Sequence, residues 1–170
     1  RESPVNDAKL NRFTPYPELA GKALRRMWAQ DAEYTHPRLA AQARKLVDAG
    51  GNVGIGAHGQ LQGLGYHWEM WLLASGGMTS QQILTSATRM GAEMIGVEQD
   101  LGTLTAGKLA DMVVLDADPL TDIRHTARLN RVIKGGEIYD ASTLDQQWPV
   151  EKPLADQWWW HLEPVAPAGE

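Results

Sequence analysis

The hydrophobic pattern of this chain changes its period near Val97, and this change limits the possible folds more than any other feature. Before that point, apolar residues recur every three or four positions, which is the spacing of amphipathic helices. After it, short apolar runs such as Met112–Leu115 are separated by turns that contain glycine and aspartate, as is typical of strands. The pattern predicts an α/β part over residues 1–97 and a small β-rich part over 98–145, followed by a tail rich in proline and tryptophan over 146–170.

Three stretches of the first part have helical spacing. One follows Pro17, one lies between Thr35 and the Gly50-Gly51 pair, and one follows Thr79. Gln82, three residues after Thr79, completes a capping box. The buried stripe predicted for this last helix consists of Ile83, Leu84, Ala87, Met90, Met94 and Ile95.

Two further segments complete the prediction. The short apolar run over residues 52–58 follows a helix and two glycines, so it is predicted to be a buried strand. Residues 63–76 are rich in tryptophan, leucine and methionine and are predicted to form a short helix. In the β-rich part, Gly135-Gly136 between two apolar runs predicts a hairpin.

Residues 54–59 contain the pattern G-x-G-x-x-G, which occurs in dinucleotide-binding loops. Such a loop needs a full strand before it and an acidic residue about 20 positions later. Only two residues separate Gly51 from Gly54, and no Asp or Glu occurs between positions 70 and 92. The alternative is that the glycines allow a sharp turn at a strand end, where α/β proteins carry their chemistry. His58 would then be a metal ligand, a general base or a structural residue, and the residues alone leave these roles open.

The composition excludes several classes of protein. Sixteen Lys and Arg residues against 21 Asp and Glu give a net charge of −5, so no basic surface for nucleic acid is expected. The chain has no cysteine, which excludes disulfides and Cys-ligated metal sites. No apolar run approaches the roughly 18 residues of a membrane span.

Three motifs occur in order along residues 31–160: "GAHGQLQGLGYHWEMWLLASGGMT", "SATRMGAEMIGV" and "LGTLTAGKLADMVVLDADPLTDIRHTARLNRVIKGGEIYD". Together they resemble the C-terminal part of the metal-dependent amidohydrolase superfamily, particularly its imidazolonepropionase- and prolidase-like members. The first motif and the "WWW" near the end of the chain are similar to amidohydrolases fused behind a TolB-like propeller.

The resemblance implies the last part of a (β/α)8 TIM-like barrel with a flanking small β-sandwich. It implies hydrolysis of a C–N bond in an amide, cyclic amide or peptide-like substrate, with a divalent metal, expected to be zinc, activating water. His58 occupies the position where such proteins usually carry Asp after strand 8, so it is the candidate catalytic and metal-binding residue. Gln60 and His67 are candidate substrate contacts, each with a structural role as the alternative.

The family's H-x-H motif does not occur in these 170 residues, and the chain begins with Arg1. We therefore expect a C-terminal piece of a longer enzyme, inactive alone, whose other metal ligands lie upstream. Its expected partners are the rest of the barrel, a propeller domain, a second copy and a small-molecule or short peptide substrate. The resemblance favours a periplasmic or secreted protein, with the cytoplasm as the alternative.

A second hypothesis is a non-catalytic assembly module, or a remnant of an enzyme that has lost its metal. In either case, three adjacent indoles at Trp158–Trp160 need a surface to pack on. That surface is either this chain's own barrel or sheet, or a missing domain or partner subunit.

Overall fold

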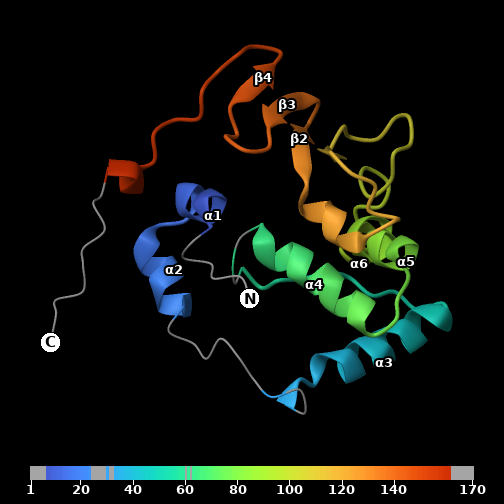
Figure 1. The fold of residues 1–170 in the computed structure, drawn as a ribbon. Coiled ribbons are helices and arrows are strands. Elements are labelled where there is room, and N and C mark those ends of the chain that lie inside the picture. Colours follow the sequence, from blue (N-terminus) through green and yellow to red (C-terminus); the bar gives the residue numbers. More distant parts are fainter. Residues whose placement is uncertain (1–6, 24–29, 31–32, 60, 62, 162–170) are drawn as a thin grey trace, which may run out of the picture.

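The computed structural model describes residues 7–23, 30, 33–59, 61 and 63–161, which divide into a helical part and a sheet part (Figure 1). The helical part contains, in chain order, α1 (Ala8–Phe13), α2 (Tyr16–Ala23), α3 (His36–Asp48), α4 (Leu64–Ser75), α5 (Ser80–Thr85), the π-helical turn η3 (Ser86–Met90) and α6 (Gly91–Met94). The sheet part contains β1 (Met112–Leu115), the 3-10 helix η4 (Ile123–Ala127), β2 (Leu129–Lys134), β3 (Glu137–Asp140), β4 (Gln146–Trp148) and the 3-10 helix η5 (Trp158–His161). This division confirms the predicted change from helical to strand periodicity.

Helix α4 lies between α3 and the sheet part (Figure 1). Its buried Met70 forms the main core with Met78, Ile83 and Ile123, and Ala43 and Val47 of α3 pack against this cluster. The two helices approach closely at Gly76, where an added Cβ would lie 2.3 Å from the carbonyl carbon of Ala40. Only glycine allows this approach, because any side chain would overlap the backbone of α3.

Helix α5 begins as the sequence predicts. The Thr79 side chain accepts a hydrogen bond from the backbone N–H of Gln82, and the Gln82 side chain accepts one from the backbone N–H of Thr79. The glutamine amide also donates to Asp48 at 2.8 Å, which joins α5 to the end of α3.

The predicted buried stripe is wrong at its C-terminal end. Ile83 and Met90 are buried, but Met94 is 59% exposed and Ile95 is 75% exposed. The cause is η3, whose wider π-helical turn takes in an extra residue. Because each helical residue turns the chain by about 100°, Met94 and Ile95 are rotated away from the core, whereas Ala92 is buried.

The sheet is antiparallel, with its strands in the order β1-β2-β3-β4. Gly135 and Gly136 form the two-residue turn between β2 and β3, with φ of +58° and +87°. The Asp111 carboxylate supports this turn by accepting the backbone N–H of Gly135 at 2.6 Å and by pairing with Lys134. These two hydrogen bonds lower the pKa of Asp111. The predicted hairpin is therefore confirmed.

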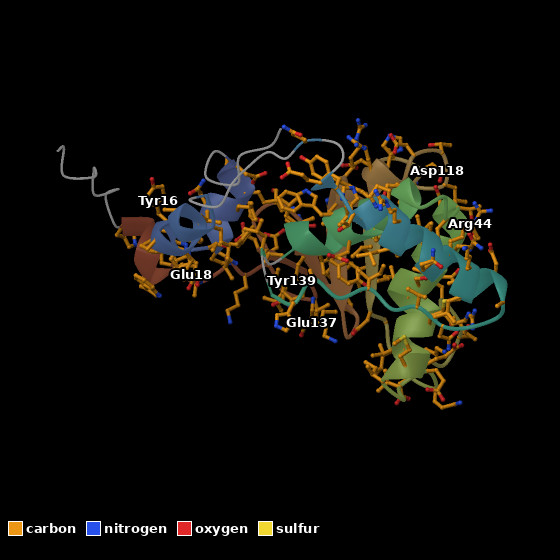
Figure 2. The ribbon with its side chains drawn as sticks, turned by 90° about the horizontal axis from the view of Figure 1, so that it is seen from below. Tyr16, Glu18, Arg44, Asp118, Glu137 and Tyr139 are labelled. Atoms are coloured by element: carbon orange, nitrogen blue, oxygen red, sulfur yellow. The ribbon has the colours of Figure 1, made fainter. Side chains whose placement is uncertain are left out.

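The sheet continues beyond the residues predicted to form it. Strand β4 begins at Gln146, inside the predicted tail, and pairs with β3. In β3 the Tyr139 hydroxyl donates to the carboxylate of Glu137, and the two side chains lie together in Figure 2. The described residues show this one sheet of four strands, without the second layer that a sandwich requires.

The N-terminal helices lie at one end of the molecule. Tyr16 and Glu18 of α2 are far from Arg44 of α3 and Asp118 of the β1–η4 loop (Figure 2). The N-terminal helices pack against α4 through a second hydrophobic cluster. This cluster contains buried Leu10, Leu19 and Leu61, with Leu64 and Trp68 of α4 beside it. Residues Leu24 to Trp28 of the helix predicted after Pro17 lie outside the described residues.

The tryptophan triplet packs on this chain's own N-terminal helix, where η5 lies beside α1 (Figure 1). The carbonyl oxygen of Arg12 accepts the indole N–H groups of Trp159, at 3.1 Å, and Trp160, at 2.6 Å. The Arg12 guanidinium lies 4.4 Å from the centre of the Trp160 ring, which is a cation–π geometry. Trp158 stacks edge-on against Trp159 and remains 67% exposed.

Candidate functional site

The segment over residues 51–57 is extended but is not a strand, so the strand predicted there is wrong for the described structure. A strand needs a neighbouring strand to complete its hydrogen bonds. The four strands seen in the described residues pair with one another in the sheet part.

This segment is instead held by side-chain contacts. The amide of Asn52 donates to Glu93 of α6 at 3.0 Å, and Ile55 packs against the main core. At Gly54 an added Cβ would lie 3.1 Å from the sulfur of Met94. The chain therefore reaches His58 along the surface of α6, with an anchor three residues before it.

His58 lies in a turn and is exposed. Its φ of +51° is left-handed, which is uncommon outside glycine although histidine is among the residues that tolerate it, and Gly59 follows with φ of +68°. The side chain is thus accessible to a ligand, as a site residue must be. Gln60, the next candidate, lies outside the described residues.

His67 lies on α4, is half-buried, and is joined to the sheet part by a hydrogen bond. Its Nδ1 is 3.2 Å from the Oγ1 of Thr126 in η4. Burial lowers the pKa of His67 below its ordinary value of 6.5, and the positive charge of Lys9 lowers it further. The ring is therefore neutral at physiological pH, which is the state that accepts a proton or binds a metal.

Other contacts fix the position of α4. The Tyr66 hydroxyl donates to the carbonyl of Ala87 in η3 at 2.8 Å, and burial raises the pKa of Tyr66. The guanidinium of Arg124 lies 5.5 Å from the ring centre of Trp71. The helix that carries His67 is thus attached on two sides.

The described residues do not form a complete metal site. Among them, no group of three or more His, Asp or Glu side chains is placed to hold an ion. An open polar depression elsewhere, lined by Asp145, Gln146, Gln147, Glu151, Lys152 and Pro153, contains neither His58 nor His67. None of the described helices is long and apolar enough to cross a membrane.

Sequence reasoning missed Thr126, because it lies 59 residues from its partner in a stretch that reads as polar and exposed. A signal was present in the spacing. Ile123 and Thr126 are both buried and stand three positions apart, which is one turn of a 3-10 helix.

Comparison with known proteins decides the family. The model of the amidohydrolase family matches residues 28–139, which include α3, α4 and most of the sheet. The chain belongs to the amidohydrolase family. This confirms the resemblance read from the three sequence motifs.

Individual relatives agree with this family. The chain is 36% identical to imidazolonepropionase from Shouchella clausii over 64 residues, which are 36% of this chain and 14% of that protein. It is 38% identical to 5'-deoxyadenosine deaminase from Methanobrevibacter smithii over 47 residues, which are 28% of this chain and 11% of the relative.

Solved structures give the same result. A Xaa-Pro dipeptidase with methionine bound in its active site matches with a TM-score of 0.55 and 28% identity, over 62% of this chain and 26% of the dipeptidase. A protein described as a prolidase from Bifidobacterium longum matches with a TM-score of 0.53 and 32% identity, over 58% of this chain and 25% of its own. This amidohydrolase-family chain therefore spans about a quarter or less of the proteins it resembles.

Proposed function

We propose that this chain is the C-terminal part of a longer metal-dependent amidohydrolase that hydrolyses a C–N bond in an amide, cyclic amide or peptide-like substrate. The observation that carries this proposal is the family match over residues 28–139, on a chain that spans only 11% to 26% of its relatives. In the whole protein, the helical part would be the last segment of a (β/α)8 barrel, and the sheet would belong to a flanking sandwich.

In this proposal His58 contributes to catalysis and metal binding, and Gln60 and His67 contact the substrate. The exposure of His58 supports its role, because an incoming ligand can reach the ring. The lowered pKa of His67 supports a neutral, hydrogen-bonding ring near the substrate. Each role belongs to the assembled protein, since a site needs groups from more than one strand end.

A divalent metal, with zinc as the first candidate, fits the family, but the described residues alone do not fit a complete site. Zinc in a catalytic site takes three protein ligands and a water. We therefore propose that most of the metal ligands come from residues outside this chain.

Exposed apolar side chains on the helical part support the presence of a further layer. Leu39 of α3 is 68% exposed, Leu46 is 51% exposed, and Ile95 after α6 is 75% exposed. We propose that the missing barrel segment covers these residues. A TolB-like propeller, a second copy of the chain and a periplasmic or secreted location remain parts of the same proposal.

The test uses the product of the complete reading frame that contains this chain. Metal content is measured first, and hydrolysis is then assayed on Xaa-Pro dipeptides, linear amides and cyclic amides. We expect bound divalent metal and hydrolysis, with His58→Ala lowering kcat/KM by about 10²-fold or more. His161→Ala is the matched control, because His161 of η5 is an exposed histidine outside the candidate site, and it is expected to leave the activity unchanged.

The opposite result has a clear meaning. A complete protein that binds no stoichiometric metal and hydrolyses none of these substrates would support the assembly-module hypothesis. Wild-type activity in His58→Ala would remove His58 from the site and leave the family assignment in place.

A further inference from the structure

The bond between His67 and Thr126 joins the helical part to the sheet part at a buried point. Thr126 is 4% exposed, so water competes little for its hydroxyl. Thr126 is on η4, the segment between β1 and β2, whereas His67 is on the first turn of α4. The position of the His67 ring, in the candidate site, therefore depends on the position of the sheet part.

The direction of this hydrogen bond follows from the second contact of Thr126. Its Oγ1 donates to the carbonyl oxygen of Ile123 at 2.8 Å. A hydroxyl carries one hydrogen, which this bond uses, so toward His67 the oxygen can only accept. Nδ1 of His67 must then carry the proton, and the neutral ring has its lone pair on Nε2.

The position of the hydroxyl does not depend on His67. Ile123 of η4 is in the main core with Met70 of α4, and the guanidinium of Arg124 faces the ring of Trp71. These contacts fix η4 against α4 one turn beyond the histidine. The Oγ1 of Thr126 is thus already in place as a hydrogen-bond acceptor for the His67 ring.

We propose that Thr126 is a positioning residue that holds His67 as the Nδ1–H tautomer, so that Nε2 is presented as an acceptor for an N–H or O–H group of an amide or peptide substrate. The second half of this statement rests on the proposed function, whereas the first half concerns the folded chain alone. In histidine, a hydrogen bond at one ring nitrogen commonly determines which of the two nitrogens is free to react.

Nuclear magnetic resonance of the ring nitrogens tests the first half on the 170-residue chain. At neutral pH we expect a protonated Nδ1 and an unprotonated Nε2 for His67 in the wild type and in Thr126→Ser. Thr126→Val removes the acceptor at nearly constant shape, and we expect the Nε2–H tautomer to gain population. Thr121→Val is the matched control, because it removes an exposed hydroxyl that donates to Asp118 and is expected to leave the His67 spectrum unchanged.

The wild-type spectrum alone can overturn the proposal, because an unprotonated Nδ1 would contradict it even if Thr126→Val did not fold. An unchanged tautomer in folded Thr126→Val would also overturn it.

Two substitutions at His67 test the second half on the complete protein. Asn places its amide N–H₂ near the position of Nδ1, whereas Gln places a polar group near Nε2. We expect His67→Asn to keep the denaturation midpoint closer to wild type and to lose more of kcat/KM, with His67→Gln showing the reverse. Equal loss of stability and activity in both variants would overturn the assignment of separate roles to the two nitrogens.

These measurements separate the proposal from the proposed function. If the tautomer is as stated but neither variant changes hydrolysis, Thr126 still positions His67, and the substrate contact is refuted. If the complete protein hydrolyses nothing, the tautomer measurement still decides the role of Thr126.

Discussion

The sheet part and the helical part of this chain satisfy their backbones in different ways. Each strand of the sheet pairs with the next strand along the sequence, across turns that belong to the same part. The extended segment 51–57 of the helical part runs along α6 and makes no strand pairing with the described residues. Exposed apolar side chains do not distinguish the two parts, since Val113 of β1 is 55% exposed as well.

The difference teaches that an antiparallel meander is complete within a short piece of sequence, whereas the strands of a parallel sheet are not. Parallel neighbours are separated by a crossover of a dozen or more residues. If the proposed barrel is correct, the segment that leads to His58 is the element of this chain that depends most on residues elsewhere in the protein.

Hydrogen exchange should show the largest contrast between the two parts. The backbone amides of β2, which is paired on both sides, are expected to exchange about 10³-fold or more slowly than those of residues 53–57. Mass spectrometry of exchanged peptides measures both. Equal protection in the two segments would contradict the difference between the paired sheet and the unpaired segment.

Truncation of the buried core should unfold the helical part most strongly. Ile83→Ala removes a side chain that is fully buried in the main cluster, and it is expected to cost about 2–5 kcal/mol in the free energy of unfolding. Ile95→Ala is the matched control at a 75% exposed position and should change stability by about 0.5 kcal/mol or less. Urea denaturation compares them, and similar costs would refute the rotation caused by η3.

The close approach of α3 and α4 should tolerate no added atom. Gly76→Ala places Cβ 2.3 to 2.5 Å from three atoms of Ala40 and Ala41, so we expect a loss of about 1–3 kcal/mol by thermal or urea denaturation. Gly56→Ala, where the added Cβ meets no atom within 4 Å, is the control and should be nearly neutral. A neutral Gly76→Ala would mean that the two helices can separate freely.

In the sheet part, a substitution at the hairpin turn should lower the free energy of unfolding through backbone strain alone. At Gly136, φ is +87° and an added Cβ meets nothing within 4 Å, so Gly136→Ala is expected to lose about 1–2 kcal/mol. Gly136→Asn should lose less, because asparagine tolerates the left-handed region better. Equal losses from the two variants would show that strain at this turn is not the cause.

The smallest effect should appear in the dependence of stability on pH. The pKa of His67 is lowered on folding, so the unfolded chain takes up a proton first as the pH falls below about 6.5. Stability from this group is therefore present above 6.5 and is lost as the pH falls through the lower pKa of the folded state. His67→Asn should reduce the difference between denaturation midpoints at about pH 7.5 and about pH 5.5, and an unchanged difference would contradict the shift.

Local signals in the sequence were sufficient for the central hairpin of the sheet and for the cap of α5. The Gly135-Gly136 hairpin and the capping box of Thr79 and Gln82 depend on residues within a few positions of each other, so their chemistry can be read directly. The exposure of Met94 and Ile95 could not be read in this way, because the π-helical turn before them adds a residue to an otherwise regular helical pattern, and the glycine that follows it, Gly91, does not distinguish such a turn from a regular helix.

The candidate site was predictable only in part. Position and residue type pointed to His58 and His67, but the strand expected before His58 needs neighbours that the described residues do not supply. The partner of His67 is far away in sequence, and its hydroxyl is buried in a segment of polar composition. Such contacts arise from tertiary packing, which a single sequence shows only through spacing.

The attachment of Trp159 and Trp160 to the carbonyl of Arg12 has a consequence for how the molecule melts. These hydrogen bonds join α1 to η5, so the two ends of the described chain are linked to each other. Unfolding of either end breaks these contacts, so we expect heat to unfold the helical part and the sheet part in one cooperative step. Trp160→Ala removes one of these hydrogen bonds, and it should let the helical part and the sheet part unfold at separate temperatures.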